Sequence, residues 1–226
     1  EMCIRASPLG VILGFSDILL RKTEKTSQNY EDLKIIERQG FHCKEIVENL
    51  LSFARIGKER SEFANLNDCI EEILKIVKHT LELNRIELKI TIGQGIPEVK
   101  CDHRQLQQVL LNIINNAIAA MVDGGILTIE TKYESIQQKA VIHITDNGQG
   151  IRDECIEHIY EPFFTTKPEG KGTGLGLFVS YGIITKYDGT IECKSHIDDS
   201  NHASSGTTFT IKLPVKTKEL QCPEKS

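Results

Sequence analysis

The octapeptide Gly170-Lys171-Gly172-Thr173-Gly174-Leu175-Gly176-Leu177 decides how this sequence is interpreted. Its alternating glycines free backbone N–H groups to surround anionic oxygens, and the helix predicted over Leu177–Lys186 adds a dipole that favours negative charge. The stretch lacks the Walker spacing of glycine to G-K-[ST], and no strand directly precedes it as in the dinucleotide fingerprint. It therefore predicts a phosphate cradle of another kind, with a flexible linker as the alternative.

A second glycine pair lies upstream, in Asp146-Asn147-Gly148-Gln149-Gly150-Ile151. It directly follows the strand predicted over Ala140–Thr145. Glycines at this place allow the backbone to approach a flat ligand while the carboxylate accepts a hydrogen bond, and adenine offers an exocyclic amine for that purpose. The alternative is an ordinary turn, because Asp, Asn and Gly are common turn residues.

Two amides interrupt the apolar pattern of the helix predicted over Asp102–Met121. Asn112 and Asn116 are spaced i, i+4 and therefore project side by side. An amide oxygen is a natural ligand for Mg²⁺, which takes phosphate and water oxygens for its other positions. Capping or surface asparagines are the alternative. The apolar face of this helix comprises Leu106, Val109, Leu110, Ile113, Ile114, Ala117 and Ile118.

The remaining patterns predict an α+β fold. Further helices are predicted over 8–21, 30–56 and 66–81, and strands over 86–92, 126–133, 140–145, 190–194 and 207–213. Helices in one block and antiparallel strands in another indicate a layer sandwich with the helices on one face of the sheet. Gly57–Asn65 is interpreted as a linker, and the polar tail from Val215 onward is expected to be disordered.

The first two helices form a predicted helical hairpin with its bend at Lys22–Asn29. The second helix carries a heptad seam, formed by Ile36, Gly40, Cys43, Val47, Leu50 and Ala54. Because a two-helix unit has too little core to stand alone, we expect the seam to pair with a second copy of the chain. The alternative is that the seam packs only within one chain.

Composition excludes several classes of protein. Hydrophobic residues make up 39% and charged residues 26%, which rules out wholesale disorder, and the net charge of -5 argues against a nucleic-acid partner. The seven cysteines form no CxxC pair, which favours reduced cytosolic thiols. The apolar stretch Val11–Leu20 is too short to span a bilayer, and we expect no signal peptide. We expect an excised cytoplasmic fragment of a longer protein.

The order of the motifs carries a resemblance. Asn112/Asn116, Asp146-x-Gly148-x-Gly150, Phe163-Phe164 and Gly172-x-Gly174-x-Gly176 follow one another, and Gly206-Thr207-Thr208-Phe209 lies near the end. In this order they resemble the nucleotide boxes of the GHKL ATP-binding superfamily. From Cys3 to Pro214 the chain resembles the catalytic core of sensor histidine kinases.

That resemblance implies a domain organisation and partners. An antiparallel helical hairpin for dimerisation and phosphotransfer would span residues 1–58 and form a four-helix bundle in the homodimer. An α/β sandwich of the GHKL ATP-binding type would span residues 66–216, and a disordered tail residues 217–226. The γ-phosphoryl group of ATP would pass towards the receiver domain of a response regulator. An upstream sensor domain would be missing from the fragment.

The resemblance also implies roles at the adenine end of a bound ATP. Asp146 would accept a hydrogen bond from the adenine amine, while Gly148 and Gly150 would permit its approach. Ile151 would form a wall against the base, and Thr207 would support the adenine end through its hydroxyl group.

At the phosphate end, Asn116 would coordinate Mg²⁺ and Asn112 would lie near the phosphates. A mobile lid would run from Phe163 to Gly172, with Phe164 within it and Lys167 as a phosphate contact. The last part of the glycine-rich loop would complete the ATP site, through Gly172, Thr173, Gly174, Leu175, Gly176 and Leu177. ATP-hydrolysing relatives place a glutamate base at the position of Asn112, so water activation is not provided here.

The first helix departs from the kinase pattern. The phosphoacceptor histidine lies five residues before the proline, and counting back from Pro8 reaches Cys3, followed by Ile4 instead of an acidic residue. His42, on the second helix, is an unorthodox alternative acceptor. Three interpretations remain: a kinase with an altered acceptor, a degenerate kinase that acts as an ATP-binding dimeric module, or a kinase that phosphorylates another chain.

Two cysteine–histidine groups could be imagined as metal ligands. Cys101-Asp102-His103 and the pair Cys193 and His196 each lack a complementary second pair. Because zinc usually needs four ligands, we expect these residues to have structural or surface roles.

Overall fold

A computed structural model describes residues 8–54, 63–168, 172–198 and 205–216. The chain divides into two compact units, which are described separately. One comprises residues 1–57 and 161–175, and the other residues 58–160 and 176–226. Within the described ranges, no helix combines the length and the apolarity needed to cross a bilayer.

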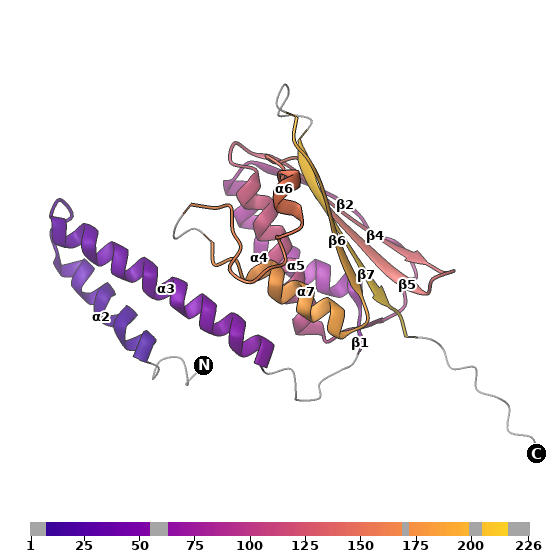
Figure 1. The fold of residues 1–226 in the computed structure, drawn as a ribbon, viewed down its shortest axis with the longest axis horizontal. Coiled ribbons are helices and arrows are strands. Elements are labelled where there is room, and N and C mark those ends of the chain that lie inside the picture. Colours follow the sequence, from indigo (N-terminus) through magenta and orange to yellow (C-terminus); the bar gives the residue numbers. More distant parts are fainter. Residues whose placement is uncertain (1–7, 55–62, 169–171, 199–204, 217–226) are drawn as a thin grey trace, which may run out of the picture. The chain divides into compact units, whose positions relative to one another are not determined.

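The second unit is built around a five-stranded sheet in the order β2-β4-β5-β7-β6. Helices α4, α5 and α7 cover one face of it, and α5 contacts both α4 and α7 (Figure 1). This arrangement confirms the expected α+β sandwich. The elements are α4 (Leu66–Leu83), β2 (Ile86–Thr91), α5 (His103–Ala120), β4 (Gly125–Glu134), β5 (Lys139–Asp146), α6 (Asp153–Ile156), α7 (Gly176–Lys186), β6 (Thr190–His196) and β7 (Gly206–Pro214).

One strand pair corrects the expected antiparallel sheet. β2 pairs in parallel with β4, with Ile86 opposite Gly125 and Thr91 opposite Glu130. The pairs β4–β5, β5–β7 and β6–β7 are antiparallel as expected. The reason lies in the connection, because α5 stands between β2 and β4 in the chain and carries it back before β4 begins, as parallel pairing requires.

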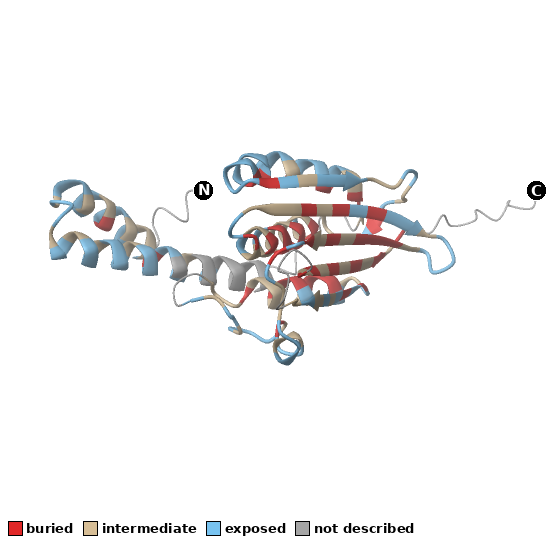
Figure 2. Cartoon of the chain, turned by 90° about the horizontal axis from the view of Figure 1, so that it is seen from above, coloured by how far each residue is buried: buried red, intermediate tan, exposed pale blue. Residues whose placement is uncertain are grey.

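The core lies between the sheet and the helices. Burial alternates along β7 and is concentrated on the sheet-facing side of α5 (Figure 2). Asp102 caps α5, since its Oδ1 accepts hydrogen bonds of 3.0 Å from the N–H groups of Arg104 and Gln105. The apolar residues predicted for this helix are buried except Ile118, which is half-buried; the buried ones are Leu106, Val109, Leu110, Ile113, Ile114 and Ala117.

A small second sheet corrects the expected linker and tail. β1 (Phe63–Ala64), inside the predicted linker, pairs antiparallel with β3 (Val99–Lys100). Val215, expected in a disordered tail, is buried and forms a bridge with Val99. The N–H of Lys216 donates to the carbonyl of Glu98 at 2.7 Å. Both ends of the domain are therefore joined to one short strand, whereas the tail over 217–226 lies outside the described residues.

The N-terminal hairpin comprises α2 (Pro8–Lys22) and α3 (Gln28–Ala54). Gly40 is buried against α2, where a Cβ atom would lie 2.7 Å from Cδ2 of Leu13. In contrast, Ile36 and Val47 are 48% and 47% exposed in the single chain. The predicted seam therefore divides, with Gly40 facing its own hairpin partner. The side chains of Leu50 and Ala54 lie outside the described residues.

Candidate nucleotide-binding site

Asp146 lies at the end of β5 and is only 4% exposed. Burial raises the pKa of its carboxyl group to about 6, while hydrogen bonds from the backbone N–H groups of Gly148 and Thr207 oppose that rise. The Gly148 N–H lies 2.9 Å from Oδ1. A buried carboxylate held by two N–H groups has acceptor capacity left for a further donor.

A hydroxyl network lies beside Asp146, where β6 and β7 pair. Oγ of Ser195 accepts a hydrogen bond of 2.7 Å from the N–H of Ile151 and lies 2.9 Å from Oγ1 of Thr207. The same oxygen donates to the carbonyl of Gly206 at 2.9 Å. Sheet pairing brings these groups together, because Asp146 is opposite Thr207 and Ser195 is also opposite Thr207.

The two glycines after Asp146 are required by protein neighbours. A Cβ atom on Gly148 would lie 2.7 Å from the carbonyl oxygen of Ala120, at the end of α5. Gly150 has φ +74°, and a Cβ there would lie 2.5 Å from the carbonyl oxygen of His196. The sequence suggested that these glycines leave room for a ligand. The structure gives a second reason, which is that the loop packs directly on α5 and β6, while the approach of a ligand stays a prediction.

Asn112 connects α5 with α7. Its Nδ2 donates to the carbonyl of Gly176 at 3.0 Å and to Oγ of Ser180 at 3.2 Å. Oγ of Ser180 also donates to Gly176 at 2.8 Å. Asn116 lies one turn further along α5 and is half-buried. Residues that the sequence singled out on two distant helices are thus in direct contact at Gly176, which begins α7.

The segment Phe163–Leu175 belongs to the first unit. The N–H of Phe163 donates to the carbonyl of Gly174 at 3.0 Å, and Gly174 has φ +66°. Because the backbone of Phe163 occupies the space that a Cβ on Gly174 would need, only glycine fits at this crossing. Gly172 lies beside Thr165 and Lys167. The first residue of the predicted lid is therefore hydrogen-bonded to Gly174, two residues beyond the end of the lid. Gly170 and Lys171 lie outside the described residues.

The other predicted members of this region are placed as follows. Phe164, Lys167, Thr173 and Leu177 are half-buried, and Leu175 is buried. Oγ1 of Thr173 accepts a hydrogen bond of 3.3 Å from the N–H of Leu175. Cys3 lies outside the described residues, as does the side chain of His42.

Sequence reasoning missed Ser195. It lies on the side of β6 that also holds the buried Ile191 and the half-buried Cys193. A polar residue in register with inward-facing ones was the available signal, because it needs a hydrogen-bonding partner. Which partner it finds depends on the pairing of β6 with β7, and periodicity within one strand does not contain that information.

The first of the two cysteine–histidine groups has structural contacts through His103. Sγ of Cys69, on α4, lies 3.2 Å from Nδ1 of His103, whose Nε2 lies 3.0 Å from Oε2 of Glu72. Burial raises the pKa of the Cys69 thiol to about 12, and Cys101 is also fully buried. This cluster joins α4 to the first turn of α5.

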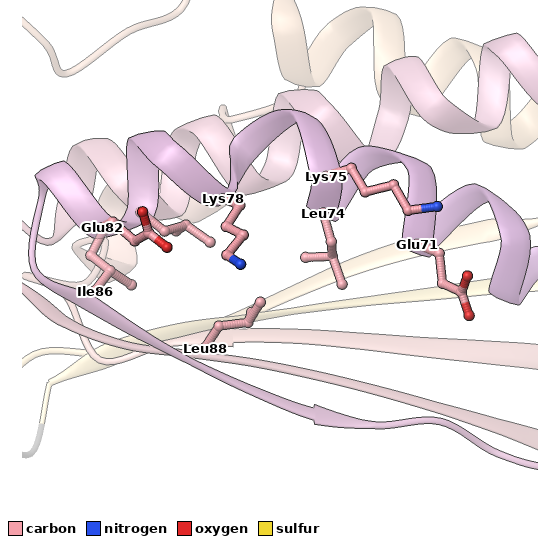
Figure 3. A pocket seen from close by; sticks show the side chains of 8 residues that line it. Glu71, Leu74, Lys75, Lys78, Glu82, Ile86 and Leu88 are labelled. Carbon is pink, nitrogen blue, oxygen red and sulfur yellow. The ribbon is translucent and has the colours of Figure 1, made fainter.

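A groove on the outer side of the domain does not include the predicted site residues. It lies between α4 and the edge strand β2, has a volume of about 480 Å³, and places Leu74 and Leu88 in its interior (Figure 3). Its other lining residues are Glu71, Lys75, Lys78, Leu81, Glu82 and Ile86.

Comparison with known families identifies the chain. Residues 101–217 match the family described as histidine kinase-, DNA gyrase B-, and HSP90-like ATPase, and residues 7–59 match the His Kinase A (phospho-acceptor) domain. The chain belongs to this ATPase family. A phospho-acceptor domain followed along the chain by the ATPase domain confirms the expected core of a sensor histidine kinase.

Individual relatives agree with this assignment. Sensor kinase CckA of Brucella abortus (strain 2308) is 36% identical over 229 aligned residues, which cover 96% of this chain and 24% of that protein. The chain spans less than half the length of CckA, of the sensor histidine kinase ZraS of Salmonella typhi and of sporulation kinase D of Bacillus subtilis (strain 168).

Solved structures share the fold of the histidine kinase core. Full-length ShkA in complex with AMPPNP aligns with a TM-score of 0.70 at 21% identity, over 93% of this chain and 43% of ShkA. ThkA in complex with the response regulator TrrA aligns with a TM-score of 0.67 at 24% identity, over 94% of this chain and 59% of ThkA.

Proposed function

We propose that this histidine kinase core binds ATP with the adenine ring against Asp146. The observation that carries the proposal is the buried carboxylate of Asp146, which is held by the N–H groups of Gly148 and Thr207 with acceptor capacity remaining. Burying a charge without a ligand disfavours folding, so its position is best explained by a donor that arrives with the ligand. The adenine amine is such a donor. Ile151 would lie against the base, and the Thr207 hydroxyl would support the same end.

The phosphate end would lie towards α5 and α7. Asn116 is half-buried, and an amide oxygen is a hard ligand of the kind that Mg²⁺ accepts together with phosphate and water oxygens. When bound, the ion would neutralise charge on the phosphates. The N-terminus of α7 at Gly176 would favour the remaining negative charge. Lys167 is a further candidate contact on the sequence resemblance alone.

The reaction proposed is transfer of the γ-phosphoryl group to a protein side chain. By the family resemblance, Asn112 would occupy the position of the hydrolytic glutamate. Its amide group donates hydrogen bonds to Gly176 and Ser180. An amide in this role cannot take a proton from water. Positioning and charge neutralisation would then supply most of the acceleration, as in other phosphoryl transfers.

The partners proposed are a second copy of the chain and a response regulator, at a cytoplasmic location. The phospho-acceptor domain match and the exposed apolar residues of the hairpin support self-association. The ThkA complex contains its response regulator TrrA, which supports the second partner by analogy only.

Calorimetry tests the nucleotide site directly. The intact 226-residue chain would be titrated with ADP and with AMPPNP, each with Mg²⁺ and with excess EDTA. We expect saturable binding of both, with AMPPNP losing more affinity in EDTA because its additional phosphate depends on the ion. No heat with either nucleotide, confirmed by an unchanged thermal midpoint, would refute the site.

A second candidate is an ATP-binding module that does not phosphorylate itself. Cys3, which stands where the phosphoacceptor is expected, favours it. Incubation with γ-labelled ATP separates the two functions. An acid-labile label on the chain supports the kinase, whereas bound nucleotide without label supports the module. The variant Cys3→His with Ile4→Glu would then show whether the rest of the chain is competent for transfer.

A further inference from the structure

Ser195 forms three contacts through one oxygen atom. Its Oγ lies 2.7 Å from the N of Ile151, 2.9 Å from the carbonyl oxygen of Gly206 and 2.9 Å from Oγ1 of Thr207. These groups come from the loop after β5 and from the start of β7, at the end of the β6–β7 pairing that also holds Ser195. Ser195 is therefore the common point at which the Ile151 loop and the Thr207 hydroxyl are joined.

The distribution of protons in this network has one consistent solution. The Ile151 N–H can only donate, so the Ser195 oxygen accepts a hydrogen bond from it. The Gly206 carbonyl can only accept, so the Ser195 hydroxyl donates its single proton to that carbonyl. The contact with Thr207 then needs a proton from Thr207. The reverse assignment would leave the oxygens of Ser195 and Gly206 at 2.9 Å with no proton between them.

The hydroxyl of Thr207 is thereby polarised in one direction. Its only proton is directed at Ser195, so its oxygen can act towards a ligand only as an acceptor. Thr207 also donates its backbone N–H to the carboxylate of Asp146, which is itself an acceptor. Two acceptors at one strand end match a 6-amino group and oppose a 6-oxo group, whose carbonyl oxygen carries lone pairs.

We propose that Ser195 is a positioning residue that makes the site selective for 6-aminopurine over 6-oxopurine nucleotides. It acts through the Thr207 hydroxyl and the backbone of Ile151, without touching the base itself. The inference rests on the proposed function, because it concerns the same adenine site. A site built to accept from a substrate N–H group rejects an analogue that lacks this group far better than an apolar pocket does.

The experiment compares ADP with inosine diphosphate, which carries a carbonyl at C6 in place of the amine. Affinities are measured by calorimetry on the intact chain and on Ser195→Ala, Ser195→Thr and Thr207→Val. Without Ser195, the Thr207 hydroxyl can turn and donate to the C6 carbonyl. We expect Ser195→Ala to narrow the ratio of ADP to inosine diphosphate affinity about tenfold, the effect of one hydrogen bond. Ser195→Thr, which keeps the hydroxyl, should retain the ratio.

A double-mutant cycle shows whether Ser195 acts through Thr207. In a Thr207→Val background, adding Ser195→Ala should not narrow the ratio further, because the hydroxyl to be polarised is already absent. Thr208→Val is the matched control. The Thr208 hydroxyl lies 3.0 Å from that of Thr145 on the opposite side of β7, and its loss should leave the ratio unchanged.

The outcomes distinguish this inference from the proposed function. If the unmodified chain prefers ADP, and Ser195→Ala lowers the affinity for ADP and for inosine diphosphate equally, then Ser195 is merely structural and the inference is overturned. If Ser195→Ala does not fold, the ratio of ADP to inosine diphosphate affinity is measured on Thr207→Val and Thr207→Ser instead. An unchanged ratio in Thr207→Val then overturns the inference too. If the unmodified chain binds no ADP, the proposed function fails and the inference fails with it.

Discussion

The side-chain Nδ2 of Asn112 lies 3.0 Å from the main-chain carbonyl oxygen of Gly176, the first residue of α7. Because a carbonyl oxygen only accepts, the amide group must present its NH₂ side to α7, which fixes the orientation of the side chain. Asn112, which the family resemblance places at the position of a hydrolytic base, is therefore a structural connection between two helices.

Replacing Asn112 tests this connection. In Asn112→Asp a carboxylate would face the Gly176 carbonyl, so we expect the free energy of unfolding to fall by about 1–3 kcal/mol at neutral pH. Urea denaturation provides the measurement. Asn115→Asp is the control, since Asn115 is exposed on the same helix and should change stability by less than about 0.5 kcal/mol. Equal losses in both variants would contradict the assigned hydrogen bond.

Asp146 is expected to determine nucleotide affinity. Asp146→Asn preserves the shape of the side chain but removes the negative charge of the carboxylate that would accept a hydrogen bond from the adenine amine. ADP affinity should therefore fall roughly tenfold to a hundredfold. Asp188→Asn is a matched change at the other end of the sheet. It loses only an exposed ion pair with Lys100. An undiminished affinity in Asp146→Asn would place the adenine elsewhere.

The same carboxyl group predicts a pH dependence. Its folded pKa of about 6 exceeds the ordinary value, so between the two values the folded chain binds more protons than the unfolded chain. Rising pH therefore lowers the stability of the nucleotide-free protein across this interval, on the order of 3 kcal/mol in total. ADP binding should strengthen over the same interval as the carboxylate ionises. Denaturation and calorimetry as a function of pH test both effects. In Asp146→Asn, the contribution of this carboxyl group to the pH dependence of stability and of ADP affinity should be absent.

Gly148 should matter even without a ligand. A methyl group there would meet the carbonyl oxygen of Ala120, so Gly148→Ala should destabilise the nucleotide-free chain by about 1–3 kcal/mol. Gly95→Ala is informative beside it. Gly95 has φ +66° but no atom near the added methyl group, so it should show the smaller cost of backbone strain alone. If Gly148→Ala were as stable as the unmodified chain, the glycine would serve only the approach of a ligand.

Self-association should depend on the exposed part of the hairpin seam. Ile36 is 48% exposed in the single chain, and Ile36→Gln should shift the protein towards monomer in sedimentation experiments at fixed concentration. Arg38→Gln alters a neighbouring exposed residue to the same side chain and should leave the association state unchanged. A dimer of undiminished affinity in Ile36→Gln would exclude this face from the contact.

The sequence alone predicted those features that one segment encodes. The apolar spacing of Leu106, Val109 and Ile113 predicted the buried side of α5, because a helix repeats every 3.6 residues whatever surrounds it. The glycine after Asp146 was noticed for the same reason, since a local backbone requirement leaves a local mark.

Features that depend on distant pairing were not predicted. The direction of β2 relative to β4 depends on the crossover through α5, and the order of Val215 depends on its contact with Val99. The role of Ser195 needs three strand ends to meet. Each of these contacts joins segments whose separate patterns are compatible with several partners.

Asn112 and Asp146 would leave different traces in a lineage that stopped using nucleotide. Asn112 joins two helices, so descendants would retain it for folding alone. Its presence in a sequence is therefore weak evidence of nucleotide binding. Asp146 carries a charge that opposes folding near neutral pH, so drift would discard it early. In sequences that lack the usual phosphoacceptor, the presence of this one carboxylate is therefore the better marker of a protein that still uses nucleotide.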